Sequence, residues 1–226
     1  MVNPDVQGKT YPVTAPYLVG REKIREFAHA VKSNAPTSLD LFAAQAGKFV
    51  SVSAGDALET TLAAFGSGAA ARSVRETARV MNIDIGGGTT KIAVCENGEL
   101  VDLTAVDIGA RIVALDAQGR LVRLEEAGRK FAEEVGVNLQ LGQPVAHEDL
   151  MRMVDRMAER IFDVAGTSAP DAINQSLLRL EPLRESKLPD VLTFSGGVSE
   201  YVYGREAQAY GDLGPLLAAA VRRKAQ

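Results

Sequence analysis

The stretch from Val80 to Val94 constrains the fold of this chain more than any other part of the sequence. It begins as an apolar, β-branched segment with an acid at Asp84, turns through Gly86-Gly87-Gly88-Thr89-Thr90, and leaves as a second alternating segment. Glycines allow the backbone to approach a bulky anion, and successive N–H groups at such a turn form a concave anion site. Threonine hydroxyls add donors for phosphate oxygens, and the Asp84 carboxylate is suited to hold a hydrated Mg²⁺ through its water ligands. The pattern predicts a phosphate-binding β-hairpin; the alternative is an ordinary glycine-rich hairpin with a surface aspartate.

Two familiar glycine-rich loops are excluded by what surrounds this turn. A P-loop requires Gly-x-x-x-x-Gly-Lys followed by Ser or Thr, and the chain has no such string. The dinucleotide fingerprint Gly-x-Gly-x-x-Gly opens into a helix, whereas Lys91 to Val94 alternates as a strand. Asn97-Gly98 is a strong signal for a two-residue hairpin. The expected order is therefore strand, glycine turn, strand, Asn-Gly turn, and a further strand over Glu99 to Asp107.

Composition excludes several classes of function. The 226 residues suffice for one large domain or two small ones with a buried core. A net charge of −4 argues against nucleic acid or an anionic membrane as partner, and no apolar run is long enough to span a bilayer. Cys95 is the single cysteine, so an intrachain disulfide is excluded and the residue is expected to be a small buried hydrophobe. With no signal-peptide pattern, a cytoplasmic location is expected.

Periodicity predicts the elements that flank the central β region. A helix over Val19 to Val31 and a strand over Lys48 to Ser53 come first. The next helix runs through Leu58, Leu62 and Phe65, with Asp56 as its N-cap and Glu59 completing a capping box.

Further along, a second hairpin is expected around Asp116 to Gly119, followed by helices over Glu126 to Val135, Glu148 to Val164 and Asp212 to Lys224. The second of these helices carries one apolar stripe, expected to be core: Leu150, Met153, Val154, Met157 and Ile161.

A second glycine turn follows the apolar run that begins at Asp190. Ser195, Gly196 and Gly197 end that run and are suited to close backbone approach beside a nucleoside or an α-phosphate. Ser-Gly-Gly alone is also typical of a plain strand-to-helix turn. Together and in this order, however, the two turns resemble the second phosphate loop and the adenosine loop of actin-like ATPases. That resemblance implies an α/β fold, a ribonuclease H-like lobe with a mixed sheet covered by helices, and ATP with Mg²⁺ as ligands.

A closer resemblance covers about residues 41 to 224. The chain is similar to the ethanolamine-utilisation reactivase family in these segments: 47–56, 66–69, 82–90, 108–112, 139–143, 194–201 and 212–217. The family implies an ATP-dependent, chaperone-like factor that acts on ethanolamine ammonia-lyase. It releases damaged cobalamin from the lyase so that intact adenosylcobalamin can enter. Gly86, Gly87, Gly88, Thr89, Thr90, Ser195, Gly196 and Gly197 are then expected to contact the nucleotide, and Asp84 to hold Mg²⁺ through water.

The chain also departs from that family. It has no Asp-Ile-Gly-Thr-Thr type of first phosphate loop before residue 80, and it stops soon after the Leu-Gly-Pro-Leu-Leu helix. We therefore expect a partial actin-like domain over residues 41–226 whose ATP hydrolysis is in doubt. An apolar surface left exposed by an absent lobe would favour self-association, so a homo-oligomer is expected.

Residues 8–31 resemble a different family, the start of MaoC-like hot-dog dehydratases. The matching stretches are Gly8 to Tyr11 and Pro16 to Val31. Residues 1–37 are accordingly expected to be a helical N-terminal segment and not a complete domain. This leaves two alternative functions, a fragment of an acyl-thioester dehydratase or hydratase and a non-catalytic module that binds the lyase. The alternative for the N-terminal segment is a generic amphipathic helix.

Overall fold

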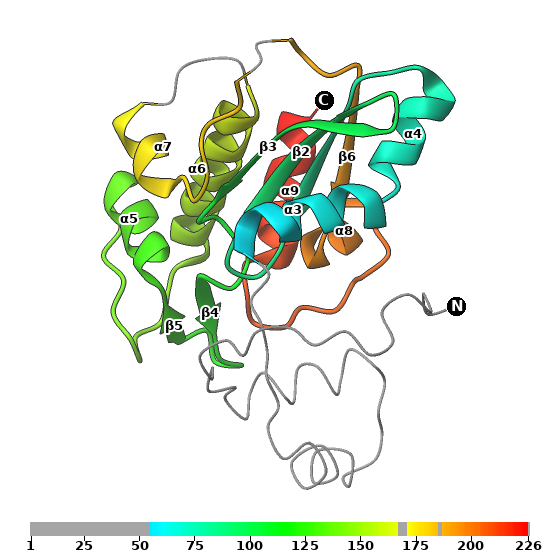
Figure 1. The fold of residues 1–226 in the computed structure, drawn as a ribbon. Helices are drawn as coiled ribbons and strands as arrows, with labels where there is room; N and C mark the ends of the chain where they lie inside the picture. Colours follow the sequence, from blue (N-terminus) through cyan, green and yellow to red (C-terminus); the bar gives the residue numbers. More distant parts are fainter. Residues whose placement is uncertain (1–54, 167–170, 185–186, 226) are drawn as a thin grey trace, which may run out of the picture. The chain divides into compact units, whose positions relative to one another are not determined.

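The computed structural model describes residues 55–166, 171–184 and 187–225, and these belong to one compact unit that begins at Gly55. Its centre is a four-stranded sheet in the order β3-β2-β1-β6 (Figure 1). The strands are β1 (Val80–Ile85), β2 (Thr90–Glu96), β3 (Glu99–Val106) and β6 (Val191–Ser195). The first three form an antiparallel meander, while β6 lies parallel to β1. The expected mixed α/β sheet is confirmed.

Local turn chemistry explains the meander. Asn97 and Gly98 both have positive φ, 51° and 85°, as the tight turn between β2 and β3 requires. A two-stranded sheet follows, with β4 (Val113–Leu115) antiparallel to β5 (Leu121–Leu124) around the turn expected at Asp116 to Gly119. Both predicted hairpins are therefore confirmed. The remaining elements are helices: α3 (Gly55–Gly66), α4 (Ala69–Glu76), α5 (Glu126–Glu134), α6 (His147–Ala165), α7 (Ala172–Leu177), α8 (Gly197–Val202) and α9 (Gly214–Lys224).

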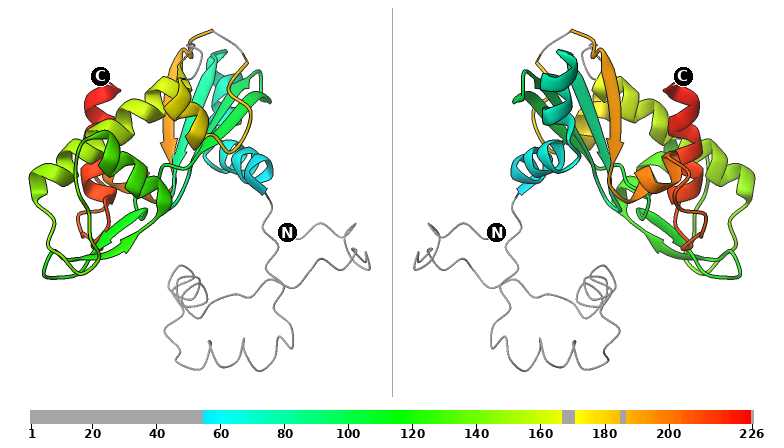
Figure 2. Two further views of the ribbon diagram at one scale, coloured as in Figure 1. Left: turned by 90° about the vertical axis from the view of Figure 1, so that its left-hand side faces the viewer. Right: turned by 90° about the vertical axis from the view of Figure 1, so that its right-hand side faces the viewer.

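The helices cover both faces of the sheet, with α3 and α4 on one face and α6, α8 and α9 on the other (Figure 2). Because side chains alternate along a strand, the two faces of β1 differ. Ile83 and Ile85 belong to a large core that the sheet forms with α6, α8 and α9. The predicted apolar stripe of α6 is fully buried in this core. On the opposite face the core is made of smaller residues: Ala64, Ala69, Ala70, Val80, Ala93 and Cys95.

The capping box expected at the start of α3 does not form. Asp56 lies inside the first turn, and its carboxylate accepts a hydrogen bond from Arg179 Nε at 2.9 Å. Glu59 instead pairs with Lys91 at 2.9 Å. Tertiary ion pairs therefore take the two acids that a local capping motif would have used. The segments predicted over residues 1–53, including the helical N-terminal segment, lie outside the described residues.

Among the described residues, none of the helices has the length and apolar character needed to cross a membrane.

A buried ion pair links α5 to α6. The side chain of Arg160 is 3% exposed and donates to Glu134 Oε1 through Nε at 3.1 Å. Arg156 donates to the same oxygen at 2.6 Å. Arg160 also pairs with Asp171, 2.5 Å away, but the Asp171 side chain is 56% exposed, so removal of Glu134 leaves the buried guanidinium only partly compensated.

We therefore expect Glu134→Ala to lower the free energy of unfolding by about 1–3 kcal/mol. Glu133→Ala is the matched control, because Glu133 is the exposed neighbour on the same helix and its loss should change stability by less than about 0.5 kcal/mol. Urea denaturation of both variants measures the difference. Equal losses would show that the Arg160 pair does not hold α5 against α6.

Candidate functional site

The two glycine turns lie side by side at one end of the sheet. In the parallel pairing of β1 with β6, Asp84 stands opposite Ser195, so both strands deliver their turns to the same edge. Gly196 has φ 79°, and a Cβ at this position would lie 2.5 Å from the carbonyl oxygen of Ile85. Only glycine permits this approach. The two turns that the sequence places far apart are therefore joined by direct backbone packing.

A chain of polar side chains ties β1 to β6 just below the turns. The Ser195 hydroxyl donates to Asp84 Oδ2 at 2.6 Å. Asn82 Nδ2 donates to the Ser195 oxygen at 2.9 Å, and the Thr193 hydroxyl donates to Asn82 Oδ1 at 2.9 Å. These bonds orient the half-buried Asp84 carboxylate, and the described residues give its other oxygen no hydrogen bond. That oxygen is placed to accept from water or from a hydrated cation.

The loop after β3 packs against the first glycine turn and is hydrogen-bonded to it. The N–H groups of Ala110 and Arg111 donate to the carbonyl oxygens of Gly86 and Gly87 at 3.0 and 2.6 Å. Gly109 makes this contact possible, because a Cβ there would lie 2.4 Å from Gly87 O. Gly88 has open space around it and is exposed. The turn is thus pinned at its first two glycines and leaves the third accessible.

The two threonines of the turn have different environments. Thr90 is fully buried, and its hydroxyl donates to Ile108 O at 2.7 Å. This hydroxyl has its partner inside the fold, and the nucleotide contact expected of Thr90 stays a prediction. Thr89 is half-buried and accepts a hydrogen bond from Lys91 Nζ at 3.0 Å. Of the two, Thr89 keeps its hydroxyl proton for a ligand.

A cavity of about 230 Å³ opens beside the turns. Gly86 and Gly87 line it from the first turn and Gly197 from the second, while Asp84, Gly88, Ser195 and Gly196 do not contribute. Its opposite wall comes from the segment between α8 and α9, which is tied back by the hydrogen bond from Leu213 N–H to Ala110 O at 2.9 Å. Small-molecule sites usually enclose roughly 300–1,000 Å³. The cavity is therefore large enough for part of a nucleotide.

Charged and aromatic side chains line the cavity at residues that sequence reasoning did not single out: Arg111, Glu200, Tyr201, Glu206, Tyr210 and Asp212. Arg111 Nε lies 3.9 Å from Asp212 Oδ2, and its alkyl chain lies against Gly87. Arg111 belongs to the string 108–112 in the loop after β3, and that string was the available signal.

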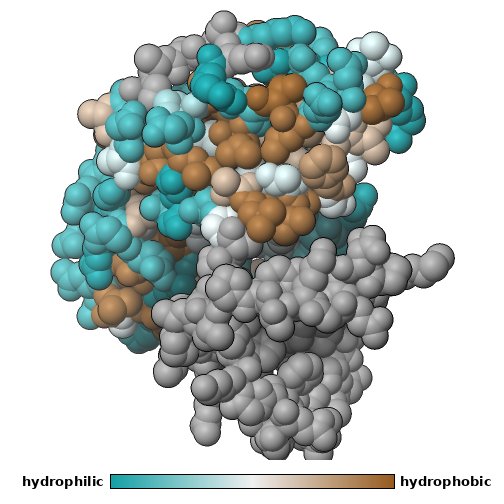
Figure 3. Space-filling view, viewed as in Figure 1, coloured by the Kyte–Doolittle hydropathy of each residue, from teal (hydrophilic) through white to brown (hydrophobic). Residues whose placement is uncertain are grey.

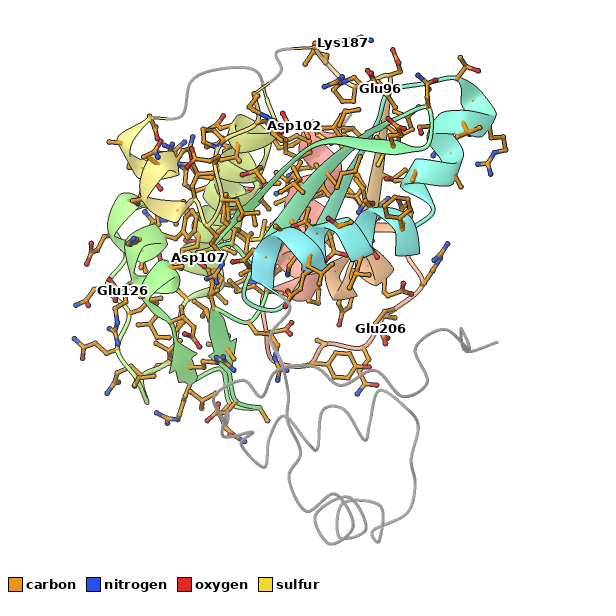
Figure 4. All side chains as sticks on the ribbon, in the orientation of Figure 1. Glu96, Asp102, Asp107, Glu126, Lys187 and Glu206 are labelled. Carbon is orange, nitrogen blue, oxygen red and sulfur yellow. The ribbon has the colours of Figure 1, made fainter. Side chains whose placement is uncertain are left out.

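Glu206 stabilises the segment between α8 and α9, which forms one wall of the cavity. Hydrogen bonds from the Gln208 N–H, the Tyr210 hydroxyl and the Ala207 N–H lower the pKa of the Glu206 carboxyl. It therefore stays ionised and bound within its own loop. Figure 4 shows Glu206 on this loop, at the opposite end of the molecule from Glu96 and Lys187. The ion pair of Glu96 with Lys187, 3.3 Å apart, therefore plays no part at the turns.

A divalent metal could not be held here by protein groups alone. The described part of the chain contains no cluster of three or more His, Cys, Asp or Glu side chains suited to a metal. Asp84 is a single carboxylate with one oxygen already bonded to Ser195. This donor set fits Mg²⁺, which keeps several waters and takes one or two carboxylates together with phosphate oxygens.

Comparison with known proteins identifies the family. The family model described as "Ethanolamine utilisation protein EutA" matches residues 27–226. The chain belongs to this family. No solved structure matches it.

Two curated relatives are ethanolamine ammonia-lyase reactivases named EutA. The chain is 37% identical over 177 residues to the one from Salmonella typhimurium and 35% identical over 178 residues to the one from Escherichia coli. Each alignment covers 77% of this chain and 38% of the relative, so the EutA-like chain aligns with well under half of their length. A separate similarity, 60% identity over 45 residues, is to a UPF0336 protein of Clavibacter michiganensis, covering 20% of this chain and 30% of that protein.

Gly109→Ala tests the packing behind the turn. The added methyl group would collide with the backbone of Gly87 and Gly88, so we expect a loss of about 1–3 kcal/mol in the free energy of unfolding. Gly88→Ala is the control, because it meets no atom within 4 Å and should leave stability unchanged or raise it by up to about 1 kcal/mol. Urea denaturation compares them. Similar curves for both variants would contradict the close approach of the loop.

Proposed function

We propose that this chain is the nucleotide-binding part of an ATP-dependent reactivating factor for ethanolamine ammonia-lyase. The observation that carries the proposal is the convergence of two glycine turns on one cavity at the ends of β1 and β6. The printed names of the EutA relatives supply the target enzyme. On this proposal, nucleotide binding is coupled to release of damaged cobalamin from the lyase, and the chain works in the cytoplasm.

The order of the strands supports an actin-like lobe as the framework. An antiparallel meander followed by a strand parallel to its first member is the arrangement expected of a ribonuclease H-like sheet. Ligands of such open sheets bind beyond the carboxyl ends of the strands. Here that edge carries Asp84, Ser195 and both turns.

In the proposed complex the turns take the phosphates by backbone approach at Gly87, Gly88 and Gly197. Thr89 supplies a hydroxyl donor, and Arg111 beside Gly87 supplies a positive charge. Asp84 holds Mg²⁺ through water, and the ion neutralises phosphate charge.

Calorimetric titration of the full chain with Mg-ATP tests nucleotide binding. Asp84→Asn keeps an acceptor for the Ser195 hydroxyl but removes the charge, so we expect the Mg²⁺-dependent affinity to fall by about 1–3 kcal/mol, roughly 5- to 150-fold. Glu126→Gln is the control, because Glu126 is exposed at the start of α5 and contributes nothing to the cavity. Failure of the parent chain to bind Mg-ATP would exclude an ATP site in this chain.

A second experiment separates an ATP-gated factor from a passive lyase-binding module. Immobilised chain is incubated with ethanolamine ammonia-lyase in the presence and absence of Mg-ATP, and the retained lyase is quantified. The proposal expects retention to depend on nucleotide and to lose that dependence in Asp84→Asn. Equal retention under all conditions would favour the non-catalytic module, in which the turns only shape the sheet.

A further inference from the structure

Lys91 is a mostly buried cation that directly follows the first glycine turn, at the start of β2. Its side chain is 12% exposed, and its ammonium Nζ lies 2.9 Å from Glu59 Oε2 on α3. The same ammonium donates a hydrogen bond to Thr89 Oγ1 at 3.0 Å. Lysine is seldom buried to this extent, because its ammonium group must give up water and find partners within the protein. Its position beside the turn therefore needs a physical reason.

Fastening α3 to the sheet explains only part of this arrangement. The helix is also held by Asp56, whose carboxylate pairs with Arg179 at 2.9 Å, and by its packing on β2 and β3. The hydrogen bond from Lys91 to Thr89 adds nothing to that attachment, because Thr89 belongs to the glycine turn and not to α3. Since the Thr89 oxygen accepts from the ammonium, its own proton is directed elsewhere. Lys91 thus orients Thr89 as a hydrogen-bond donor.

The neighbours of Lys91 in the sheet place an acid beside this base. Asp84 is its direct partner on β1, and Ala105 is its direct partner on β3. Directly opposed residues of antiparallel strands project from the same face of the sheet, with Cβ atoms about 5 Å apart. Among the described residues, however, the ammonium pairs with Glu59 and not with Asp84. A Mg²⁺–phosphate ligand carries the two complementary charges, a cation suited to Asp84 and an anion suited to Lys91.

The ion pair with Glu59 is one that the ammonium can exchange for a stronger partner. Glu59 is 42% exposed, so water can solvate its carboxylate once the cation leaves, and such pairs contribute little stability. Helix α3 has no basic residue, and the surface over it is hydrophobic (Figure 3), formed by Leu58, Leu62 and Phe65. Lys91 is therefore the cation nearest to hand for Glu59. A phosphate group, with more charge and several acceptor oxygens, binds an ammonium more strongly than this carboxylate does.

We propose that Lys91 is a phosphate-binding residue of the nucleotide site, held by Glu59 until the ligand binds. This inference rests on the proposed function, because its ligand is the Mg²⁺–nucleotide complex of that site. A phosphate oxygen that accepts from the Thr89 hydroxyl lies close to Lys91 Nζ, since the two groups are 3.0 Å apart. Arg111 contacts the turn from the cavity, and Lys91 contacts it from the side of α3. The first turn thereby has a cation on each side, with Asp84 for the metal.

Calorimetric titration with Mg-ATP separates a binding role from a structural one, because the two halves of the ion pair then have opposite effects. Lys91→Met removes the partner of the phosphate, and we expect the affinity of the full chain to fall about 10- to 150-fold. Glu59→Gln removes only the competitor for the ammonium, so the affinity should be at least that of the parent and up to about fivefold higher. A fall in both variants would show that the pair merely holds α3 and would overturn the proposal.

Lys130→Met is the matched control, because Lys130 lies on α5 and lines no part of the cavity. It should bind Mg-ATP like the parent, and thermal unfolding shows that each variant is folded. A parent chain that does not bind Mg-ATP would overturn the proposed function and this inference with it. Binding by the parent that Lys91→Met retains in full would overturn this inference alone.

Chemical labelling of the parent chain tests the same contact without a substitution. Acetic anhydride acetylates amines, and mass spectrometry measures the rate at each lysine. We expect saturating Mg-ATP to slow the acetylation of Lys91 severalfold and to leave Lys187 unaffected. Lys187 is 66% exposed and pairs with Glu96, which ends β2 at the opposite end from the turn. Equal rates at Lys91 with and without Mg-ATP would overturn the proposed contact.

Discussion

The parallel pairing of β1 with β6 is the constraint on which the rest of the structure depends. It joins residues that are far apart along the chain, such as Asp84 and Ser195, 111 positions apart. Closing a loop of this size costs conformational entropy before any contact offsets it. Two sets of contacts offset this cost, and both form only in one register. One is the series of hydrogen bonds that links Thr193, Asn82, Ser195 and Asp84. The other is the close approach of Gly196 to Ile85. The pairing therefore also sets the relative position of the two turns.

The same register decides which face of the sheet carries the polar groups. Along β1, Asn82 and Asp84 share the face of Val80, where the core contains small residues, while Ile83 and Ile85 face the large core. Small residues let α3 lie close to the sheet, and its Glu59 then reaches Lys91, which in turn contacts Thr89. The closeness of α3 to the glycine turn and the exposure of Leu58, Leu62 and Phe65 on its outer side have one cause. Both follow from the small side chains between helix and sheet.

Local signals in the sequence were enough for the elements whose chemistry is local. Asn97-Gly98 predicted its hairpin because the turn requires positive φ, and the spacing of Met153 and Met157 predicted the buried side of α6 because burial follows the helical period. The buried side of α3 could not be predicted in this way, since Thr60 and Ala64 are buried only because the small residues Ala93 and Cys95 lie opposite. The capping box at Asp56 failed for the same reason, as Arg179 comes from a distant segment.

The site shows the same division. Convergence of the two turns was predictable, because adjacent parallel strands end at the same edge. The structural role of Thr90 was not, because its partner Ile108 belongs to the next loop, and neither was the approach of Arg111 to Gly87, which depends on Gly109. Sequence patterns predicted which residue types suit a phosphate. Tertiary packing decides which of these residues keep a hydrogen-bond donor that is not already used inside the fold.

The charges around the cavity restrict how an anionic ligand could bind there. Glu200, Glu206 and Asp212 line it with Arg111, so the wall carries more negative than positive groups. A bare polyphosphate would be repelled by such a wall, since unit charges about 4 Å apart interact by roughly 4 kcal/mol near a protein surface. The described residues hold no cluster able to bind the cation first. In the proposed site the metal and the phosphates must therefore bind together, each completing the other's coordination, with Asp84 as the protein's contribution. Binding of nucleotide without Mg²⁺ would contradict the conclusion that the negative charge of the wall requires the metal and the phosphates to bind together.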